Sequence, residues 1–233
     1  MRWISAIALV VMLFLTSCSS KEPLPGEELI LDARKDYRAL DSARVEIVND
    51  ITGETEQTFT FKYDEKGIMV YSYTGDSDGV HLKQFNNGRE QFTYDNGVVT
   101  VLSSADLDFT AYSRDVPYPM ADEGLILFYK NGIIPEKCLL QEVSLQGAAN
   151  PVTHIKHEYD VSKISSEYSG EGELKSFSVD YNFDCEGNLL DFIESAEIAN
   201  DDETKSYRYL VKIYDKNAVE KVENVVDISD IDN

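Results

Sequence analysis

Three histidines could carry acid–base or metal chemistry at neutral pH, but their spacing supports neither. His154 and His157 lie three positions apart in a stretch with strand-like alternation, and His81 stands alone. Side chains three apart on a strand point to opposite faces, so these two cannot readily bind one metal ion. The spaced motifs H-E-x-x-H, the P-loop and the Rossmann glycine pattern do not occur in the sequence. The letters G-x-S-x-G occur at residues 75–79, but a strand is expected after them, not the helix that follows a nucleophile elbow. We therefore expect no catalytic residues and a protein that is not an enzyme.

Acidic residues are abundant, with 43 Asp and Glu against 21 Lys and Arg and a formal net charge of −22. Paired carboxylates therefore arise by chance, and they identify neither a glycosidase nor a protease. The turns at 76–79 and 106–108 carry carboxylates two apart, but both lack the other oxygen ligands of a calcium loop. We expect no metal and no cofactor, and an acidic surface also argues against nucleic acid as a partner.

Cys18 is the best candidate for covalent modification because of the residues before it. Arg2 precedes an apolar run over residues 4–15, and Leu15-Thr16-Ser17-Cys18 follows. A basic start, a short apolar run and small residues are typical of a secretory signal. The tetrad resembles the lipobox of bacterial lipoproteins, which implies cleavage before Cys18 and a palmitate-type lipid on its sulfur. The alternatives are an ordinary signal peptide with an incidental cysteine, or an uncleaved anchor.

The lipobox resemblance divides the start of the chain and implies its location. Residues 1–17 are the signal peptide, and residues 18–26 are the lipidated cysteine and a flexible tether that contains two prolines. The membrane is then a partner through the lipid on Cys18. The location implied is the bacterial cell envelope, outside the cytoplasm. In a monoderm this is the outer leaflet of the cytoplasmic membrane, and in a diderm it is alternatively the outer membrane.

Cys138 and Cys185 are the two remaining cysteines. An exported location permits a disulfide between them, and two cysteines allow one connectivity. Two free thiols are the equal alternative.

The residues that could form a site must be positioned by one helix and a long series of strands. The helix is expected over residues 27–42, where Leu29, Ala33, Tyr37 and Leu40 fall on one stripe. Alternation with period two, separated by turn residues such as Asn-Gly, then predicts an antiparallel meander. Its expected strands begin at Ala43 and continue over 59–63, 68–73, 80–85, 90–94, 98–102, 138–145, 152–161, 174–183, 189–198 and 206–214.

Two segments depart from this alternation. Residues 122–131 predict a short apolar helix, with a strand over 125–129 as the competing interpretation. Residues 216–233 form an acidic tail that we expect to be frayed. The folded domain is accordingly expected over residues 27–215.

The order of these elements resembles the LolA/LolB-like lipoprotein family. The resemblance lies in a helix ending in Tyr37-x-x-Leu40-Asp41-Ser42, the alternating pair Val45 and Ile47, and the strand Phe59-x-Phe61-x-Tyr63. It implies an α+β fold in which a mostly antiparallel meander forms an open half-barrel. The N-terminal helix and the short apolar helix would cover that half-barrel.

The resemblance also implies a concave apolar surface that binds acyl chains. Both faces of residues 68–73 are apolar or aromatic, as expected where one face meets a core and the other a cavity. The alternative is that these aromatic residues only pack against the helices. The candidate cavity residues are Phe59, Phe61, Tyr63, Met69, Tyr71, Tyr73, Leu125, Ile126 and Phe128.

Together these features predict a non-enzymatic, membrane-anchored envelope lipoprotein that binds or carries a lipid or lipopeptide. The alternative is a surface interaction or sensory lipoprotein that binds an envelope protein and has no ligand cavity. A third hypothesis is a hydrolase whose site has no recognised motif.

Overall fold

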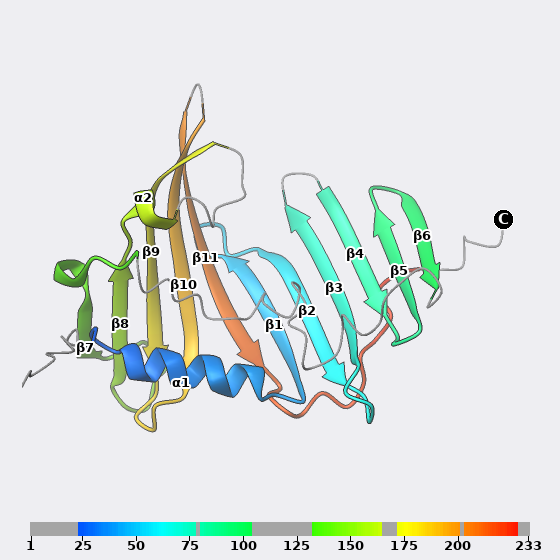
Figure 1. Ribbon diagram of the computed structural model, residues 1–233, viewed down its shortest axis with the longest axis horizontal. Coiled ribbons are helices and arrows are strands. Elements are labelled where there is room, and N and C mark those ends of the chain that lie inside the picture. The colour runs from blue at the N-terminus through cyan, green and yellow to red at the C-terminus, as the bar shows by residue number, and fades with distance from the viewer. Residues whose placement is uncertain (1–22, 78–79, 104–131, 165–171, 201–202, 228–233) are drawn as a thin grey trace, which may run out of the picture.

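The computed structural model describes residues 23–77, 80–103, 132–164, 172–200 and 203–227. The predicted signal peptide, Cys18 and the segment that holds Leu125, Ile126 and Phe128 lie outside these ranges. The described strands form one eleven-stranded antiparallel sheet, with helix α1 lying across one face (Figure 1). This confirms the mostly antiparallel architecture. Among the described helices, none combines the length and apolar character that crossing a membrane requires.

The first part of the chain comprises α1 (Glu27–Arg38), β1 (Ser42–Asn49), β2 (Thr55–Tyr63), β3 (Met69–Ser77), β4 (Val80–Asn86), β5 (Glu90–Asp95) and β6 (Val98–Ser103). The second part comprises η3 (Pro135–Lys137), β7 (Leu139–Val143), β8 (Val152–Glu158), α2 (Val161–Ile164), β9 (Glu173–Phe183), β10 (Leu189–Ala199) and β11 (Thr204–Tyr214). Every strand expected from the alternation is present. The strand predicted to reach Val161 instead ends at Glu158, because α2 begins at Val161.

The first and last strands meet in the middle of the sheet. The strand order is β6-β5-β4-β3-β2-β1-β11-β10-β9-β8-β7, so two meanders join where β1 pairs with β11. Val45 on β1 lies opposite Phe59 on one side and Ile213 on the other. Strands β6 and β7 form the two ends of this order, so the described sheet is open.

Two hairpin turns fix the ends of β2 and β9 with the same chemistry. The Asp64 side chain accepts hydrogen bonds from the amides of Lys66 and Ile68, and Asp184 accepts them from Glu186 and Asn188. A glycine with positive φ completes each turn, with φ 74° at position 67 and φ 86° at position 187. Both turns lie at the α1 end of the sheet (Figure 1).

Helix α1 is shorter than the sequence suggests. Acidic residues in its first turn and basic residues in its last turn complement the helix dipole. The expectation that it extends to Ser42 is wrong. The amides of Ala39 and Leu40 bond back to the last turn, and Ser42 already pairs with Lys62 as the start of β1.

We call the face of the sheet that α1 covers the inner face. Ile30, Ala33, Tyr37 and Leu40 are buried in the same core as the inner residues of the strands. At the start of the helix, Gly26 lies directly over Ile155, where an added Cβ would come within 2.3 Å of the isoleucine side chain. The helix therefore closes one end of the inner face.

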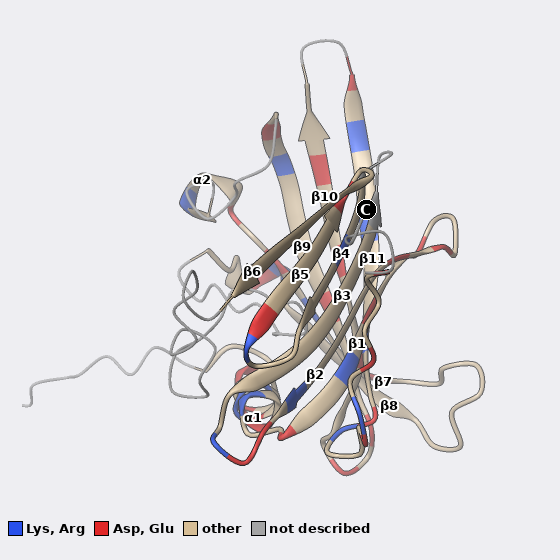
Figure 2. Ribbon diagram, turned by 90° about the vertical axis from the view of Figure 1, so that its right-hand side faces the viewer, with Lys and Arg blue, Asp and Glu red and all other residues tan. Residues whose placement is uncertain are grey.

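Residues 215–227, here called the C-terminal segment, lead from the end of β11 to the opposite, outer face. Figures 1 and 2 show this segment and α1 on different sides of the sheet, with charged residues along the segment. Lys62 donates to the carbonyls of Val219 and Glu220, at 3.0 and 2.9 Å. Val222 and Val226 are buried. The expectation of a frayed tail is therefore wrong for this part of it, because β2 supplies partners to the segment's backbone.

Candidate functional site

The candidate cavity residues that the structure describes share the inner face of β2 and β3. Phe59 lies opposite Tyr73, Phe61 opposite Tyr71, and Tyr63 opposite Met69. Residues directly opposite in an antiparallel pair point to one face, so the alternation places all six together. Leu125, Ile126 and Phe128 lie outside the described residues.

Four of these six residues belong to the closed core. Phe59, Phe61, Met69 and Tyr71 are at most 3% exposed. The Phe61 ring packs edge-on against Tyr37 of α1, with centroids 6.1 Å apart, and lies 5.6 Å from the Phe59 ring. These four side chains are packed into the core beneath the helix, whereas Tyr63 and Tyr73 remain half-buried.

Beyond α1, the inner face carries a second group of apolar and aromatic side chains, all half-buried. We call it the inner-face band. Val211 of β11 lies opposite Ile47, and Tyr207 of the same strand lies opposite Ala196, which in turn lies opposite Phe177. The members of the band are Ile47, Tyr73, Phe177, Ala196, Tyr207 and Tyr209. Ile47, Tyr73, Phe177 and Ala196 pack against the core, and the half-buried Glu194 of β10 lies opposite Tyr209 on the same face.

Tyr73 holds its place in the band by lying over a glycine. A Cβ added at Gly75 would come within 2.6 Å of the Tyr73 hydroxyl, so only glycine leaves room for the ring. The hydroxyl donates to Gln57 Oε1 at 3.1 Å. The sequence shows a glycine two positions after Tyr73. Only the structure shows that the Tyr73 ring lies along the strand and over this glycine.

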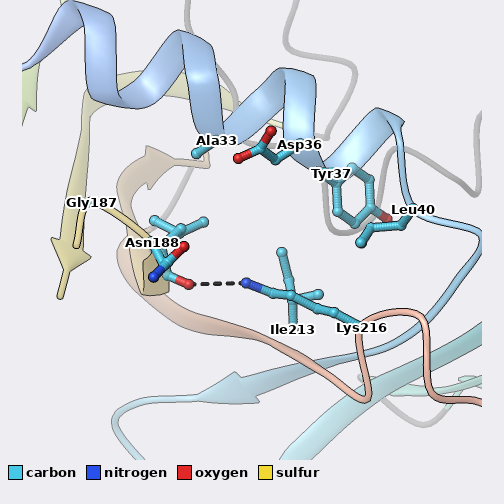
Figure 3. A pocket seen from close by; sticks show the side chains of 9 residues that line it. Ala33, Asp36, Tyr37, Leu40, Gly187, Asn188, Ile213 and Lys216 are labelled. Atoms are coloured by element: carbon cyan, nitrogen blue, oxygen red, sulfur yellow. Dashed lines mark hydrogen bonds between the residues drawn. The ribbon is translucent and has the colours of Figure 1, made fainter.

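A small pocket lies under α1 at the turn end of the sheet (Figure 3). Its volume is about 120 Å³. Lys216 crosses its floor and donates to the carbonyl of Leu189 at 3.1 Å. Its lining consists of Ala33, Asp36, Tyr37, Leu40, Gly187, Asn188, Leu189, Ile213 and Lys216. Pockets for drug-sized ligands measure roughly 300–1,000 Å³, so this one suits only a small occupant.

The two neighbouring histidines point to opposite faces, as their spacing predicts. His154 lies on the outer face, where its ring nitrogens are 3.2 Å from Asn182 Oδ1 and 3.3 Å from Asp180 Oδ1. His157 is buried on the inner face, and its Nε2 lies 2.8 Å from the carbonyl of Pro25. Burial lowers the pKa of His157, against smaller opposing effects of the Pro25 carbonyl and the Glu27 carboxylate. In the described part of the chain, no three metal-ligating side chains come together.

Cys138 and Cys185 are free thiols in the structure. Cys138 lies near η3, where its Sγ is 3.5 Å from the carbonyl of Ile134, and burial raises the pKa of its thiol. Cys185 is exposed in the turn between β9 and β10.

Sequence reasoning missed most of the inner-face band. Tyr207, Tyr209 and Ala196 sit in strands that the alternation identifies, but their surroundings come from β1 pairing with β11. That pairing joins segments more than half the chain apart, and nothing local encodes it.

Comparison with known proteins gives structural likenesses only. No family model matches the sequence, and no curated protein matches it. The chain is similar in structure to LprF from Mycobacterium bovis, with 12% identity and a TM-score of 0.48, over 88% of this chain and 100% of that chain. It is also similar to the lipoprotein LppX of Mycobacterium tuberculosis, with 11% identity and a TM-score of 0.44, over 84% of this chain and 97% of that chain.

A third likeness is weaker. MucB, in its complex with MucA, matches at 10% identity with a TM-score of 0.16, over 80% of this chain and 92% of that chain. With TM-scores below 0.5, these likenesses say nothing about what this chain binds.

Proposed function

We propose that this chain is a non-enzymatic, lipid-anchored protein of the bacterial envelope that binds an apolar ligand, a lipid or lipopeptide, on the inner face of its open sheet. Residues 1–17 serve as the signal peptide in this proposal, and Cys18 carries the anchor. The domain then begins after the tether at residue 26.

The observation that carries this proposal is the inner-face band. Its residues are half-buried although they are apolar or aromatic, and Ile47, Tyr73, Phe177 and Ala196 among them pack against the buried core. Tyr207 and Tyr209 pack ring to ring at 6.2 Å, and tyrosine suits a surface that is apolar below and wet above. Apolar surface gains roughly 25 cal/mol per Å² when it leaves water, so an acyl chain laid along this band would be stabilised there.

The short tether supports the proposal because it limits the distance between the sheet and the membrane. Pro25 is held to the domain by the hydrogen bond between its carbonyl and His157. A chain from Cys18 to Pro25 reaches at most roughly 25 Å at 3.3–3.6 Å per residue. An anchor on Cys18 would therefore keep the sheet within about one domain diameter of the bilayer.

The test is mass spectrometry of lipids that co-purify with the full chain expressed in a bacterium. We expect a bound lipid in the wild-type protein and a reduced amount in Tyr207→Asp, because the charge would sit in the band. Ser206→Asp is the matched control, since residue 206 is adjacent but points to the outer face. Absence of lipid from the wild-type protein, or equal loss in both variants, would contradict the proposal.

The anchor has its own test. Growth with an alkyne-labelled fatty acid should label the wild-type protein and leave Cys18→Ser unlabelled. Labelling of both would contradict the assignment of Cys18.

The second candidate function is a surface interaction lipoprotein without a ligand cavity. It is favoured by the closure of Phe59, Phe61, Met69 and Tyr71 into the core and by the small volume of the pocket under α1. Lipid-free protein that cross-links to one envelope protein in cells would support this function over ligand binding.

A further inference from the structure

The inner face changes its chemistry between β3 and β5. On β2 and β3 the inward positions 59, 61, 63, 71 and 73 are aromatic, whereas the neighbouring inward positions on β4 and β5 carry amides and a hydroxyl. Tyr71 lies opposite Asn86, and Asn86 lies opposite Gln91. One pair further along, Gln84 lies opposite Thr93. We call Gln84, Asn86, Gln91 and Thr93 the amide patch.

Hydrogen bonds within the amide patch use only part of its capacity. The Tyr71 hydroxyl donates to Gln91 Oε1 at 3.2 Å, and Gln91 Nε2 donates to Thr93 Oγ1 at 3.4 Å. Asn86 Oδ1 accepts from the amide of Gly88 at 2.7 Å. Asn86 Nδ2 and Gln84 Oε1 have no partner among the described residues, although both atoms are shielded from solvent.

These two unpartnered atoms are costly in a protein that binds nothing at this place. Asn86 is 0% exposed, so its Nδ2 cannot recover a hydrogen bond from bulk water. The turn after β4 explains the presence of Asn86, because the Asn86 oxygen accepts a hydrogen bond from the Gly88 amide. Among the described residues, no hydrogen bond to a turn explains the Gln84 amide in the same way. Residues two apart on a strand present their side chains roughly 6.6 Å apart on one face. The patch thus offers a donor and an acceptor side by side.

The charges around the amide patch select the kind of partner. Among the described inward positions of β4 and β5, Asp95 is the only charged residue, and it is exposed at the strand end. Lys83 points to the outer face, where its Nζ lies 5.9 Å from the Tyr94 ring centroid. A phosphate or carboxylate head group would therefore find no cation at these positions, whereas hydroxyl groups can both donate and accept.

We propose that Gln84 and Asn86 bind an uncharged, hydroxyl-bearing head group of an amphiphile, so that the site selects neutral amphiphiles over phosphorylated ones. This inference rests on the proposed function, since the apolar part of the same ligand lies on the inner-face band. The head group supplies the two hydrogen bonds that the amide patch leaves open.

The test measures the affinity of the full chain for two probes with the same alkyl chain, dodecyl glucoside and dodecyl phosphate, by calorimetry below their micelle concentrations. We expect tighter binding of the glucoside. Gln84→Met should weaken glucoside binding by about three- to tenfold, the effect of one hydrogen bond, and leave phosphate binding unchanged. The same variant should raise the melting temperature of the ligand-free protein, because it removes a buried unpartnered oxygen.

Asn86→Ser is a second variant, chosen because a serine oxygen can still accept from the turn amide while the amide nitrogen is lost. Lys83→Met, on the outer face, is the control and should change neither affinity. Equal binding of the two probes, or equal losses for both in Gln84→Met, would overturn this inference and leave the proposed function standing. Binding of neither probe by the wild-type protein would overturn both.

Discussion

Burial of His157 should make the stability of this protein depend on pH in the near-neutral range. The imidazole is fully buried on the inner face, and burial disfavours its charged form. Its pKa is therefore lower in the folded protein than in the unfolded chain, where histidine titrates near about 6.5. The hydrogen bond to Pro25 survives protonation, because Nε2 donates in both states. The stability lost at acidic pH is thus the free energy of burying a charged imidazole at position 157.

The sign and size of the effect follow from proton linkage. Below pH about 6.5 the unfolded chain binds a proton that the folded protein does not, so the free energy of unfolding falls as pH falls. For one group the slope is at most about 1.4 kcal/mol per pH unit. This contribution is fully present above the unfolded-state pKa and is lost between that value and the lower folded-state pKa. For a group that is half-protonated in the unfolded chain at pH about 6.5, the loss between roughly pH 6.5 and 5.5 is at most about 1 kcal/mol.

The assay is urea unfolding at three pH values, about 7.5, 6.5 and 5.5, which bracket the ordinary pKa of histidine. The wild-type protein should lose more stability across this range than His157→Gln, in which no imidazole titrates. His81→Gln is the control, because it removes an exposed histidine, whereas His157 is buried. Parallel profiles for the wild-type protein and His157→Gln would refute the reasoning.

Two further predictions concern the inner and outer faces. Gly75→Ala should destabilise the protein by about 1–3 kcal/mol, because its Cβ collides with the Tyr73 ring. Thermal unfolding checks this, and an unchanged melting temperature would show that the ring can move without cost. Lys62→Met should speed hydrogen exchange in the C-terminal segment by about tenfold, since the segment loses two bonds from a charged donor. Unchanged exchange there, with Lys66→Met as an exposed control, would contradict this.

The strands were predictable because their signals are local. Alternation such as that around Phe59 and Phe61 sets the face, and turns such as the one at Asp64 set the ends. The meander and its few helices followed from these signals. The pairing of β1 with β11 could not be predicted in this way, because no residue near either strand in the sequence gives a signal for it.

The candidate site was only partly predictable for the same reason. The sequence places Tyr71 and Tyr73 on one face, but which of them is covered depends on where α1 and its Tyr37 come to rest. The expectation for the C-terminal segment was wrong because its composition is acidic. Its order depends on a hydrogen bond from Lys62 and on one from the Val219 amide to Ser42, and both residues lie far away in the sequence.

The pairing of the first strand with the last has a consequence for how the chain folds. The centre of the sheet cannot form until β11 is available, and the bond from the Val219 amide to Ser42 Oγ joins residues 177 apart. Closing a loop of this size costs roughly 4–5 kcal/mol of chain entropy before any contact repays it. The two meanders should therefore form first, with the edges of β1 and β11 open. A chain truncated before β11 would keep an unpaired β1 edge, which is a hazard for aggregation.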